Sequence, residues 1–267
     1  MAPTIKVDKV QENLKTKLFG KYMFFSREVG STNDWAKELA ELDAPEGTVA
    51  IAETQTAGRG RLGRKWHSPK GGLWFSIILK PNLKPTETVK LVFLASLAVA
   101  ETIRELYSLK AETKWPNDVI VDGRKVCGIL LEMKTVGERV IYAVIGVGIN
   151  VNIDIEKEFP RELWEKATSL EVVLGKKIVL ETFFKALLEK MESLYQVFLE
   201  GGFSPVLAKW KAYASFLGCE VEVSSGDEKF EGVALDVNGG GALVLKLKDD
   251  TVKHVFAGDL SLKIKGC

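Results

Sequence analysis

Cysteine and histidine are scarce in this sequence of 267 residues, which contains three cysteines and two histidines. Cys127, Cys219 and Cys267 share no short spacing, so the ligand clusters of structural zinc sites are excluded. A small and odd number of cysteines is also typical of a reducing compartment. The 46% of hydrophobic and 27% of charged residues are those of a globular protein, which excludes a disordered or fibrous chain.

The sequence also lacks an excess of charge and a long apolar run. Its 37 basic and 36 acidic residues give a net charge of +1, so a basic binding site has to be local rather than a property of the whole surface. The longest apolar run, residues 91–100, is far shorter than the roughly 20 residues of a membrane span. The first residues contain no apolar core of a signal peptide. We therefore expect a soluble, cytoplasmic protein without a membrane partner.

The pattern of hydrophobic residues predicts two parts, a catalytic domain over residues 1–218 and a small domain over residues 219–267. Apolar periodicity and caps predict helices in the first part, and short apolar runs predict strands between them. After Gly218, short alternating strands separated by glycine- and aspartate-rich turns predict a small β-barrel. The segments expected to be helical are 4–20, 32–42, 90–109 and 180–200, and one that opens at Ser204-Pro205.

The helix expected from Thr32 begins after a polar residue that is typical of a helix cap. Ser31 and Asp34 resemble a capping box in which aspartate replaces the usual glutamate. Taken alone, Ser31-Thr32-Asn33 is therefore a helix cap and nothing more.

Residues 57–69, A-G-R-G-R-L-G-R-K-W-H-S-P, form the most unusual segment, which we call the glycine–arginine loop. Three glycines allow backbone N–H groups to approach a ligand, and four cations within seven residues are suited to phosphate or carboxylate groups. The simpler alternative is a flexible, solvated basic loop. A Walker A loop is excluded because no G-K-[ST] follows, and the G-x-G-x-x-G match lacks a surrounding dinucleotide-binding unit.

Residues 114–129, K-W-P-N-D-V-I-V-D-G-R-K-V-C-G-I, predict a hairpin with functional side chains. The Asp122-Gly123 pair is a strong turn signal that places Lys125 at the start of the next strand, so Asp118 and Lys125 could face each other across the hairpin. These two side chains could bind Mg²⁺ and a phosphate group, or only each other. A turn cap for Asp118 and a solvated surface role for Lys125 are the structural alternatives.

Residues 146–150, G-V-G-I-N, end a predicted strand. Small residues there allow a ligand to come close to the backbone, although a glycine bulge would explain them equally well. Asn150 offers a donor and an acceptor, which suits the edge of an adenine base.

Together these segments resemble the biotin protein ligases, also called biotin–[acetyl-CoA-carboxylase] ligases. The shared pieces are S-T-N at Ser31, G-R-G-R-x-G-R-x-W at Gly58, K-W-P-N-D at Lys114, R-K-x-x-G-I-L at Arg124 and G-x-G-I-N at Gly146. Their order and spacing agree with the family over nearly the whole chain.

The resemblance implies an α+β fold, in which a mixed β-sheet backed by helices precedes an SH3-like barrel. It implies that biotin reacts with ATP, in the presence of Mg²⁺, to form biotinyl-5′-AMP, and that a lysine of a biotin carboxyl carrier protein then takes the biotinyl group. Some members carry an N-terminal DNA-binding domain. Because S-T-N begins 30 residues from the start here, we expect the form without that domain and no DNA partner. Members also pair through the sheet, so we expect a homodimer.

The resemblance also implies roles for individual residues. Lys125, Arg61 and Asp118 are the expected catalytic residues, with Asp118 also placing Mg²⁺. Gly58 to Arg61 would wrap the valeryl chain and its carboxylate, Arg64 would reach the outgoing phosphates, and Gly128 would let the strand backbone lie against biotin. The full set expected to bind biotin is Ser31, Thr32, Asn33, Gln55, Gly58, Arg59, Gly60, Arg61, Lys125 and Gly128. The set expected to bind ATP or the adenylate is Arg59, Arg61, Arg64, Trp66, Lys114, Asn117, Lys125 and Asn150.

Two alternatives stand beside this interpretation. Lipoyl ligases and octanoyl transferases share the catalytic fold, but their R-R-x-S-G-G-G-A-V runs are not found here. A nucleic-acid-binding module would use the glycine–arginine loop and the barrel, but the near-neutral charge and the lack of an aromatic stripe argue against it.

Overall fold

The computed structural model describes residues 5–262, so Cys267 and the first four residues lie outside it. A seven-stranded sheet runs through the larger part in the order β1-β2-β3-β7-β6-β5-β4. Only the β1–β2 pair is parallel, which confirms the expected mixed sheet. The strands are β1 (Met23–Val29), β2 (Val49–Gln55), β3 (Leu73–Leu79), β4 (Ala111–Lys114), β5 (Asp118–Val121), β6 (Arg124–Val136) and β7 (Arg139–Ile149).

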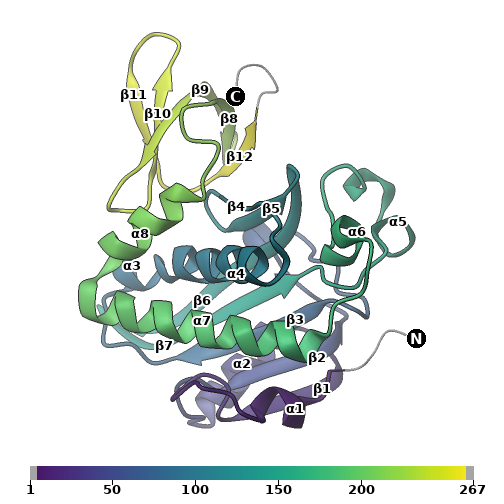
Figure 1. Ribbon diagram of the computed structural model, residues 1–267. Coiled ribbons are helices and arrows are strands. Elements are labelled where there is room, and N and C mark those ends of the chain that lie inside the picture. The colour runs from purple at the N-terminus through teal and green to yellow at the C-terminus, as the bar shows by residue number, and fades with distance from the viewer. Residues whose placement is uncertain (1–4, 263–267) are drawn as a thin grey trace.

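Helices cover both faces of this sheet. Figure 1 shows α4 (Leu91–Tyr107) and α7 (Leu180–Gly201) lying across one face, with α8 (Phe203–Ala212) leading to the second sheet. α7 lies there because its buried residues recur at helical spacing on one side. α2 (Thr32–Glu41) packs Ala36 and Ala40 against a separate apolar cluster that includes β2, β3 and β7 residues. The short helices are α1 (Val7–Gln11), α3 (Pro85–Thr88), η1 (Arg61–Gly63), α5 (Ile155–Glu158), η2 (Arg161–Leu163) and α6 (Leu170–Leu174). None of the helices in residues 5–262 has the length and apolar character needed to cross a bilayer.

The second sheet confirms a small C-terminal β-structure. It has five antiparallel strands in the order β11-β10-β9-β8-β12, and its first strand begins at Glu220. Its buried side chains belong to the same continuous apolar core as those of the main sheet, and Trp115 Nε1 donates to Gly241 O at 3.0 Å. The second sheet is therefore fixed against the first. Its strands are β8 (Glu220–Ser225), β9 (Glu228–Val237), β10 (Leu243–Leu247), β11 (Val252–Val255) and β12 (Asp259–Leu262).

Two local predictions about helices are wrong. The long N-terminal helix is only α1, because the chain turns at Asn13, where φ is 57°. α2 begins at Thr32 as expected, but the Ser31 side chain makes no capping hydrogen bond. Instead Thr32 N donates to Gln55 Oε1 at 2.7 Å, so a side chain from β2 satisfies the free N–H at the start of the helix.

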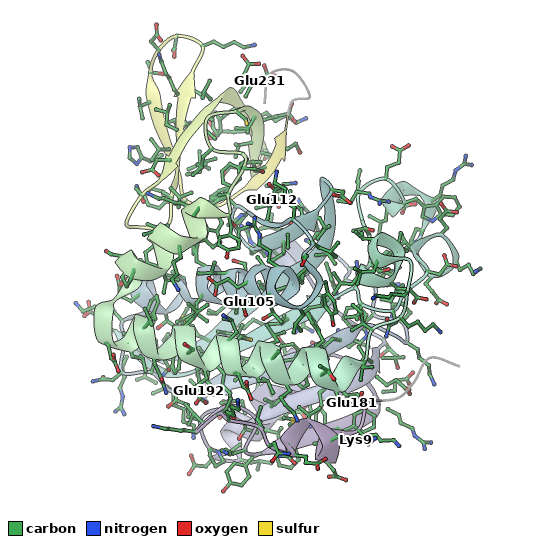
Figure 2. All side chains as sticks on the ribbon, in the orientation of Figure 1. Lys9, Glu105, Glu112, Glu181, Glu192 and Glu231 are labelled. Carbon is green, nitrogen blue, oxygen red and sulfur yellow. The ribbon has the colours of Figure 1, made fainter. Side chains whose placement is uncertain are left out.

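The segment between α1 and β1 is held by one buried carboxylate on α7. Glu192 is 5% exposed and accepts hydrogen bonds from the backbone N–H groups of Lys17, Leu18 and Phe19 at 2.6, 2.7 and 2.7 Å. Figure 2 shows Glu192 on α7 beside this segment. Three successive N–H donors around one carboxylate stabilise an irregular backbone that has no sheet partner.

We expect Glu192→Gln to lower the free energy of unfolding by about 2–3 kcal/mol, because an amide has one acceptor oxygen and places its NH₂ group against N–H donors. Urea unfolding of the two proteins measures this difference. Glu189→Gln is the matched control, since Glu189 accepts a hydrogen bond from Lys15 N at 3.0 Å from a less buried position on the same helix. Equal losses in both variants would contradict the importance of the buried carboxylate.

Candidate active site

The glycine–arginine loop folds as a narrow hairpin beside the main sheet. Gly60 N donates to Arg64 O at 2.7 Å and Trp66 N donates to Gly58 O at 2.9 Å, so the backbones of the two arms pair. The tip is η1, where Leu62 has a φ of 56°. A Cβ atom at residue 58 would lie 2.6 Å from Trp66 O, which explains why that position is glycine.

The hairpin forms one wall of a cavity of about 250 Å³. Most of the residues predicted from the sequence line this cavity: Ser31, Thr32, Asn33, Gln55, Arg59, Gly60, Arg61, Arg64, Trp66, Asn117, Asp118, Lys125, Gly128 and Asn150. Gly58 and Lys114 do not line it. The structure thus brings segments together that lie more than 100 residues apart in the chain. Lining residues that the sequence analysis did not select include Lys65, His67, Phe159, Leu163, Lys166, Ala167 and Asp259.

One end of the cavity is polar and uncharged. Gln55 Oε1 accepts the hydrogen bond from Thr32 N, and Gln55 Nε2 donates to Ser68 Oγ at 2.8 Å. The Thr32 hydroxyl oxygen lies 2.8 Å from Ser76 Oγ, which is fully buried. Because these side chains hold one another, this end presents fixed donors and acceptors to a neutral polar group.

The other end carries the cations. Lys125 Nζ lies 2.7 Å from Asp118 Oδ1, so the predicted proximity of these side chains in the β5–β6 hairpin is confirmed. The same ammonium lies 5.1 Å from the centre of the Trp66 ring. Burial lowers the pKa of the Lys114 ammonium, although the Asp118 carboxylate opposes this shift. Asp118 therefore faces a cluster of positive charge.

The arginines of the loop differ in their partners. Arg61 donates to Gly258 O at 3.0 Å and to Asn117 Oδ1 at 3.3 Å, and its burial lowers the pKa of its guanidinium. Arg64 pairs with Asp259 at the start of β12. Gly258, directly before β12, and Asp259, its first residue, thus contribute oxygen atoms directly to the site.

The glycines of residues 146–150 leave room for side chains of the protein itself. A Cβ atom at Gly146 would collide with Asn33 Oδ1, and one at Gly148 would collide with Trp66 Nε1. Gly128 stands under the same indole, since a Cβ atom there would lie 3.0 Å from Trp66 Cζ3. The interpretation that these glycines leave space for a ligand is therefore incomplete, because the space beside them is occupied by the Asn33 and Trp66 side chains.

Two buried polar atoms beside these glycines lack a partner. Trp66 Nε1 and Asn150 Oδ1 have no hydrogen-bond partner within residues 5–262. Asn150 Nδ2 donates to Thr168 O at 3.0 Å, which fixes the amide so that its oxygen remains available. An unsatisfied buried donor and acceptor are costly unless a ligand or water pairs with them.

The wall next to Asn150 comes from the connection between α5 and α6. Lys125 N donates to Lys166 O at 2.8 Å, and Thr168 N donates to Lys125 O at 2.9 Å. These two bonds attach the connection to the start of β6, at the lysine that faces Asp118. Sequence patterns gave no signal for this segment because its pairing with β6 is irregular and distant in the chain.

Three carboxylates near the loop were not predicted to lie beside its arginines, and Asp34 was expected to form a capping box with Ser31 instead. Asp34 forms a two-point ion pair with Arg59, with nitrogen–oxygen distances of 2.5 and 2.6 Å. Glu132 lies 3.6 Å from the same guanidinium, and Asp259 pairs with Arg64. Of the three, Glu132 had a visible signal, since it is a charged residue within the apolar run of β6. Within the described part of the chain, no group of three or more histidine, cysteine, aspartate or glutamate residues could bind a metal ion.

Comparison with known proteins places the chain in one family. The model of the biotin/lipoate A/B protein ligase family matches residues 25–150, and that of the biotin protein ligase C-terminal domain matches residues 216–263. The bifunctional ligase/repressor BirA of Bacillus subtilis is 37% identical over 254 residues, which are 95% of this chain and 78% of that protein. The Escherichia coli BirA is 30% identical, over 88% of this chain and 72% of that protein.

Solved structures agree in fold. A biotin protein ligase from Aquifex aeolicus in complex with biotin and ATP has a TM-score of 0.77 and 32% identity, covering 91% of this chain and 99% of that one. A biotin protein ligase from Leishmania major in complex with biotinyl-5-AMP has a TM-score of 0.62 and 25% identity, covering 89% and 99%. Both the main sheet and the C-terminal sheet are thus shared with ligand-bound relatives.

Proposed function

Because the chain belongs to the biotin protein ligase family and has its ligase activity, we propose that it activates biotin with ATP and transfers the biotinyl group to a lysine of a biotin carboxyl carrier protein. The observation that carries this proposal is a cavity with a neutral polar end and a cationic end. Biotin has a neutral ureido ring at one end and a carboxylate at the other. The cavity is therefore suited to biotin in one orientation.

The polar end is the proposed ureido site. Ser31, Thr32 and Gln55 would bind the ring, with Asn33 beside them. Gly128, which lies next to Lys125, would let the strand backbone lie against the rest of biotin. The backbone of residues 58–61 would enclose the valeryl chain, which brings the carboxylate near Arg61 and Lys125. The network around Gln55 and Ser76 is already formed, so little side-chain ordering is required when biotin binds.

The first step needs preorganised positive charge. A carboxylate oxygen of biotin attacks the α-phosphorus of ATP, the P–O bond to the β-phosphate breaks, and pyrophosphate leaves. Arg61 and Lys125 would stabilise the negative charge on the carboxylate and α-phosphate, and Arg64 would meet the outgoing phosphates. Lys114 and Asn117 would support the nucleotide around Asp118, where burial already lowers the pKa of the Lys114 ammonium.

The adenine base is assigned to Trp66 and Asn150. The unpartnered Asn150 Oδ1 could accept a hydrogen bond from the amino group of adenine, and the Trp66 indole provides an apolar surface. The connection between α5 and α6 would close this side of the base. The supporting observation is that ligand binding would satisfy a buried acceptor that the described residues leave free.

Mg²⁺ would be bound mainly by the substrate. Asp118 supplies one carboxylate, already paired with Lys125, and within residues 5–262 no group of three or more histidine, cysteine, aspartate or glutamate residues could hold a metal ion. This donor set fits a cation that keeps several waters and binds phosphate oxygens with one protein carboxylate. When bound, the ion would neutralise phosphate charge. Asp118 would hold it in place and would also orient the Lys125 ammonium.

Substitution of Gly148 by alanine tests the nucleotide site. The added methyl group would displace the Trp66 indole, so we expect ATP to bind roughly tenfold or more weakly. Biotin affinity should change much less, because the ureido site is at the other end of the cavity. Isothermal titration with each ligand measures both effects. Gly239→Ala, where a Cβ atom meets nothing within 4 Å, is the control.

Removal of the Lys125 ammonium should damage chemistry more than folding. We expect Lys125→Ala to slow biotin-dependent ATP–pyrophosphate exchange by about 10²- to 10³-fold, as for one donor to a developing oxyanion. Lys134→Ala is the matched control, because Lys134 lies on the same strand and pairs with the exposed Glu41 instead. Unchanged exchange by Lys125→Ala would overturn the assignment.

The transfer step defines the experiment for the whole reaction. The amine of the acceptor lysine attacks the carbonyl carbon of the mixed anhydride, AMP leaves, and the nitrogen loses a proton. We propose that this occurs in the cytoplasm, and that it can be followed on a carrier domain incubated with the protein, ATP, Mg²⁺ and biotin. Mass spectrometry should find one biotinyl increment on one lysine. Labelling with lipoate in place of biotin would contradict the substrate.

A homodimer formed through the main sheet is the proposed assembly. β5 pairs with β6 only from Arg124 to Gly128, so within the described residues the rest of β6 has no strand on that side. An unpaired strand edge can add a strand from a second copy. Sedimentation equilibrium should then give twice the mass of 29.5 kDa, and a monomer at all concentrations would contradict this.

A further inference from the structure

Arg59 differs from the other arginines of the glycine–arginine loop in what it binds. Its guanidinium forms a two-point ion pair with Asp34 on α2, at 2.5 and 2.6 Å, and lies 3.6 Å from Glu132 on β6. Arg61 and Arg64 instead contact the C-terminal segment around residue 258. Arg59 therefore attaches the first arm of the loop to the body of the protein.

The two carboxylates that hold Arg59 are themselves fixed. Lys37 Nζ lies 2.8 Å from Asp34 Oδ1 and 2.9 Å from Glu132 Oε1, and Asn33 Nδ2 donates to Glu132 Oε2 at 2.8 Å. We call Asp34, Lys37, Arg59 and Glu132 the Arg59 anchor. Two cations and two carboxylates balance one another, and a two-point arginine pair within such a network is stronger than an isolated surface pair.

The protonation states support the anchor at neutral pH. The hydrogen bond from Arg59, together with Lys37, holds the pKa of the Asp34 carboxyl well below its usual range despite partial burial. Burial raises the pKa of Glu132, but the hydrogen bonds from Asn33 and Lys37 outweigh it and the net shift is downward. The carboxylates of Asp34 and Glu132 are therefore ionised at neutral pH.

The second arm of the loop reaches the same network by another route. Asn33 Oδ1 accepts a hydrogen bond from Ser76 Oγ at 2.6 Å, and Ser76 Oγ lies 2.8 Å from Thr32 Oγ1. Thr32 N then donates to Gln55, whose Nε2 donates to Ser68 Oγ at the end of the loop. Both ends of the loop are thus tied to the polar side chains of the proposed ureido site.

We propose that Arg59 is a positioning residue, and that its ion pairs with Asp34 and Glu132 fix the first arm of the loop before any substrate binds. Residues 61–65 at the tip are then the part that rearranges around the carboxylate and the phosphates. This assignment rests on the proposed ligase function. In this assignment Arg59 does not contact biotin or the adenylate directly but acts through the position of the loop.

Trypsin gives a test that needs no substrate. The enzyme cleaves after arginine only when the guanidinium can leave its partners. Arg61 makes single hydrogen bonds to the uncharged Gly258 O and Asn117 Oδ1, whereas Arg59 makes a two-point ion pair, so cleavage after Arg61 should be faster than cleavage after Arg59. In Asp34→Asn, and more so with Glu132→Gln added, cleavage after Arg59 should rise about tenfold relative to cleavage after Arg61. Mass spectrometry of early fragments distinguishes the two bonds.

Glu41→Gln is the matched control for this experiment. Glu41 pairs with Lys134 and so joins α2 to β6 as Lys37 and Glu132 do, but it touches no loop residue in the described structure. Cleavage after Arg59 should be unchanged in this variant. Equal cleavage after Arg59 and Arg61 in the unmodified protein, or the same ratio in Asp34→Asn, would overturn the anchor.

Steady-state kinetics separate positioning from contact. If Arg59 acts through the anchor, Arg59→Gln and Asp34→Asn should raise the biotin KM of adenylate formation by a similar factor, about tenfold, with little change in kcat. The double variant should be no worse than either single one, because both remove the same interaction. Arg59→Lys, which keeps charge without the two-point geometry, should lie between.

The alternative outcome is distinct. If Arg59 contacts substrate, Arg59→Gln should be far more damaging than Asp34→Asn, and the anchor would be rejected. If the unmodified protein forms no biotinyl-AMP at all, the proposed function fails, whereas the trypsin comparison still decides whether Arg59 is anchored.

Discussion

The repulsion among the cations of the glycine–arginine loop is the constraint on which the rest of the site depends. Four positive side chains lie within seven residues, and such a segment is stable in one conformation only where oxygen atoms of the protein lie close to them. Arg59 is held by Asp34, Arg64 by Asp259, and Arg61 by a backbone carbonyl. These partners belong to α2 and to the C-terminal sheet. The loop is therefore held from two sides, by α2 and by the segment that begins β12.

α2 links this loop to the polar end of the cavity because its first turn is bound by distant side chains rather than by its own cap. Gln55 Oε1 accepts a hydrogen bond from the free N–H of Thr32, and Asn33 is buried between Ser76 and Glu132. Asn33 fits there only because residue 146 on β7 has no side chain. Two motifs that lie more than 110 residues apart in the sequence are thus packing partners. The same helix that covers the second face of the sheet also forms a wall of the site.

Local signals in the sequence predicted most of the elements, and the resemblance to the family implied most of the predicted residues that line the cavity, whereas partners distant in the chain were missed. The Asp122-Gly123 turn fixes its hairpin through its own backbone preferences, so the proximity of Asp118 and Lys125 could be predicted. The N-terminal segment has no such local determinant. Its backbone is satisfied by Glu192, which lies more than 170 residues later. For the same reason Asp259 could not be assigned, because an aspartate at the start of a short strand looks like any turn residue.

The oxygen partners of the arginines also bear on how the proposed reaction begins. A bare guanidinium in a half-buried cavity would suffer a desolvation penalty, and the lowered pKa of Arg61 reflects that burial. Contact with Gly258 O and Asn117 offsets part of this penalty before substrate arrives. When a triphosphate binds, its oxygen atoms would then replace protein oxygen atoms as the partners of cations that already line the cavity. Such an exchange requires little reorganisation, which is the property that makes fixed charges effective at a developing negative centre. Because Arg61 draws one of those partners from Gly258, directly before β12, the orientation of this cation depends on the position of the C-terminal sheet.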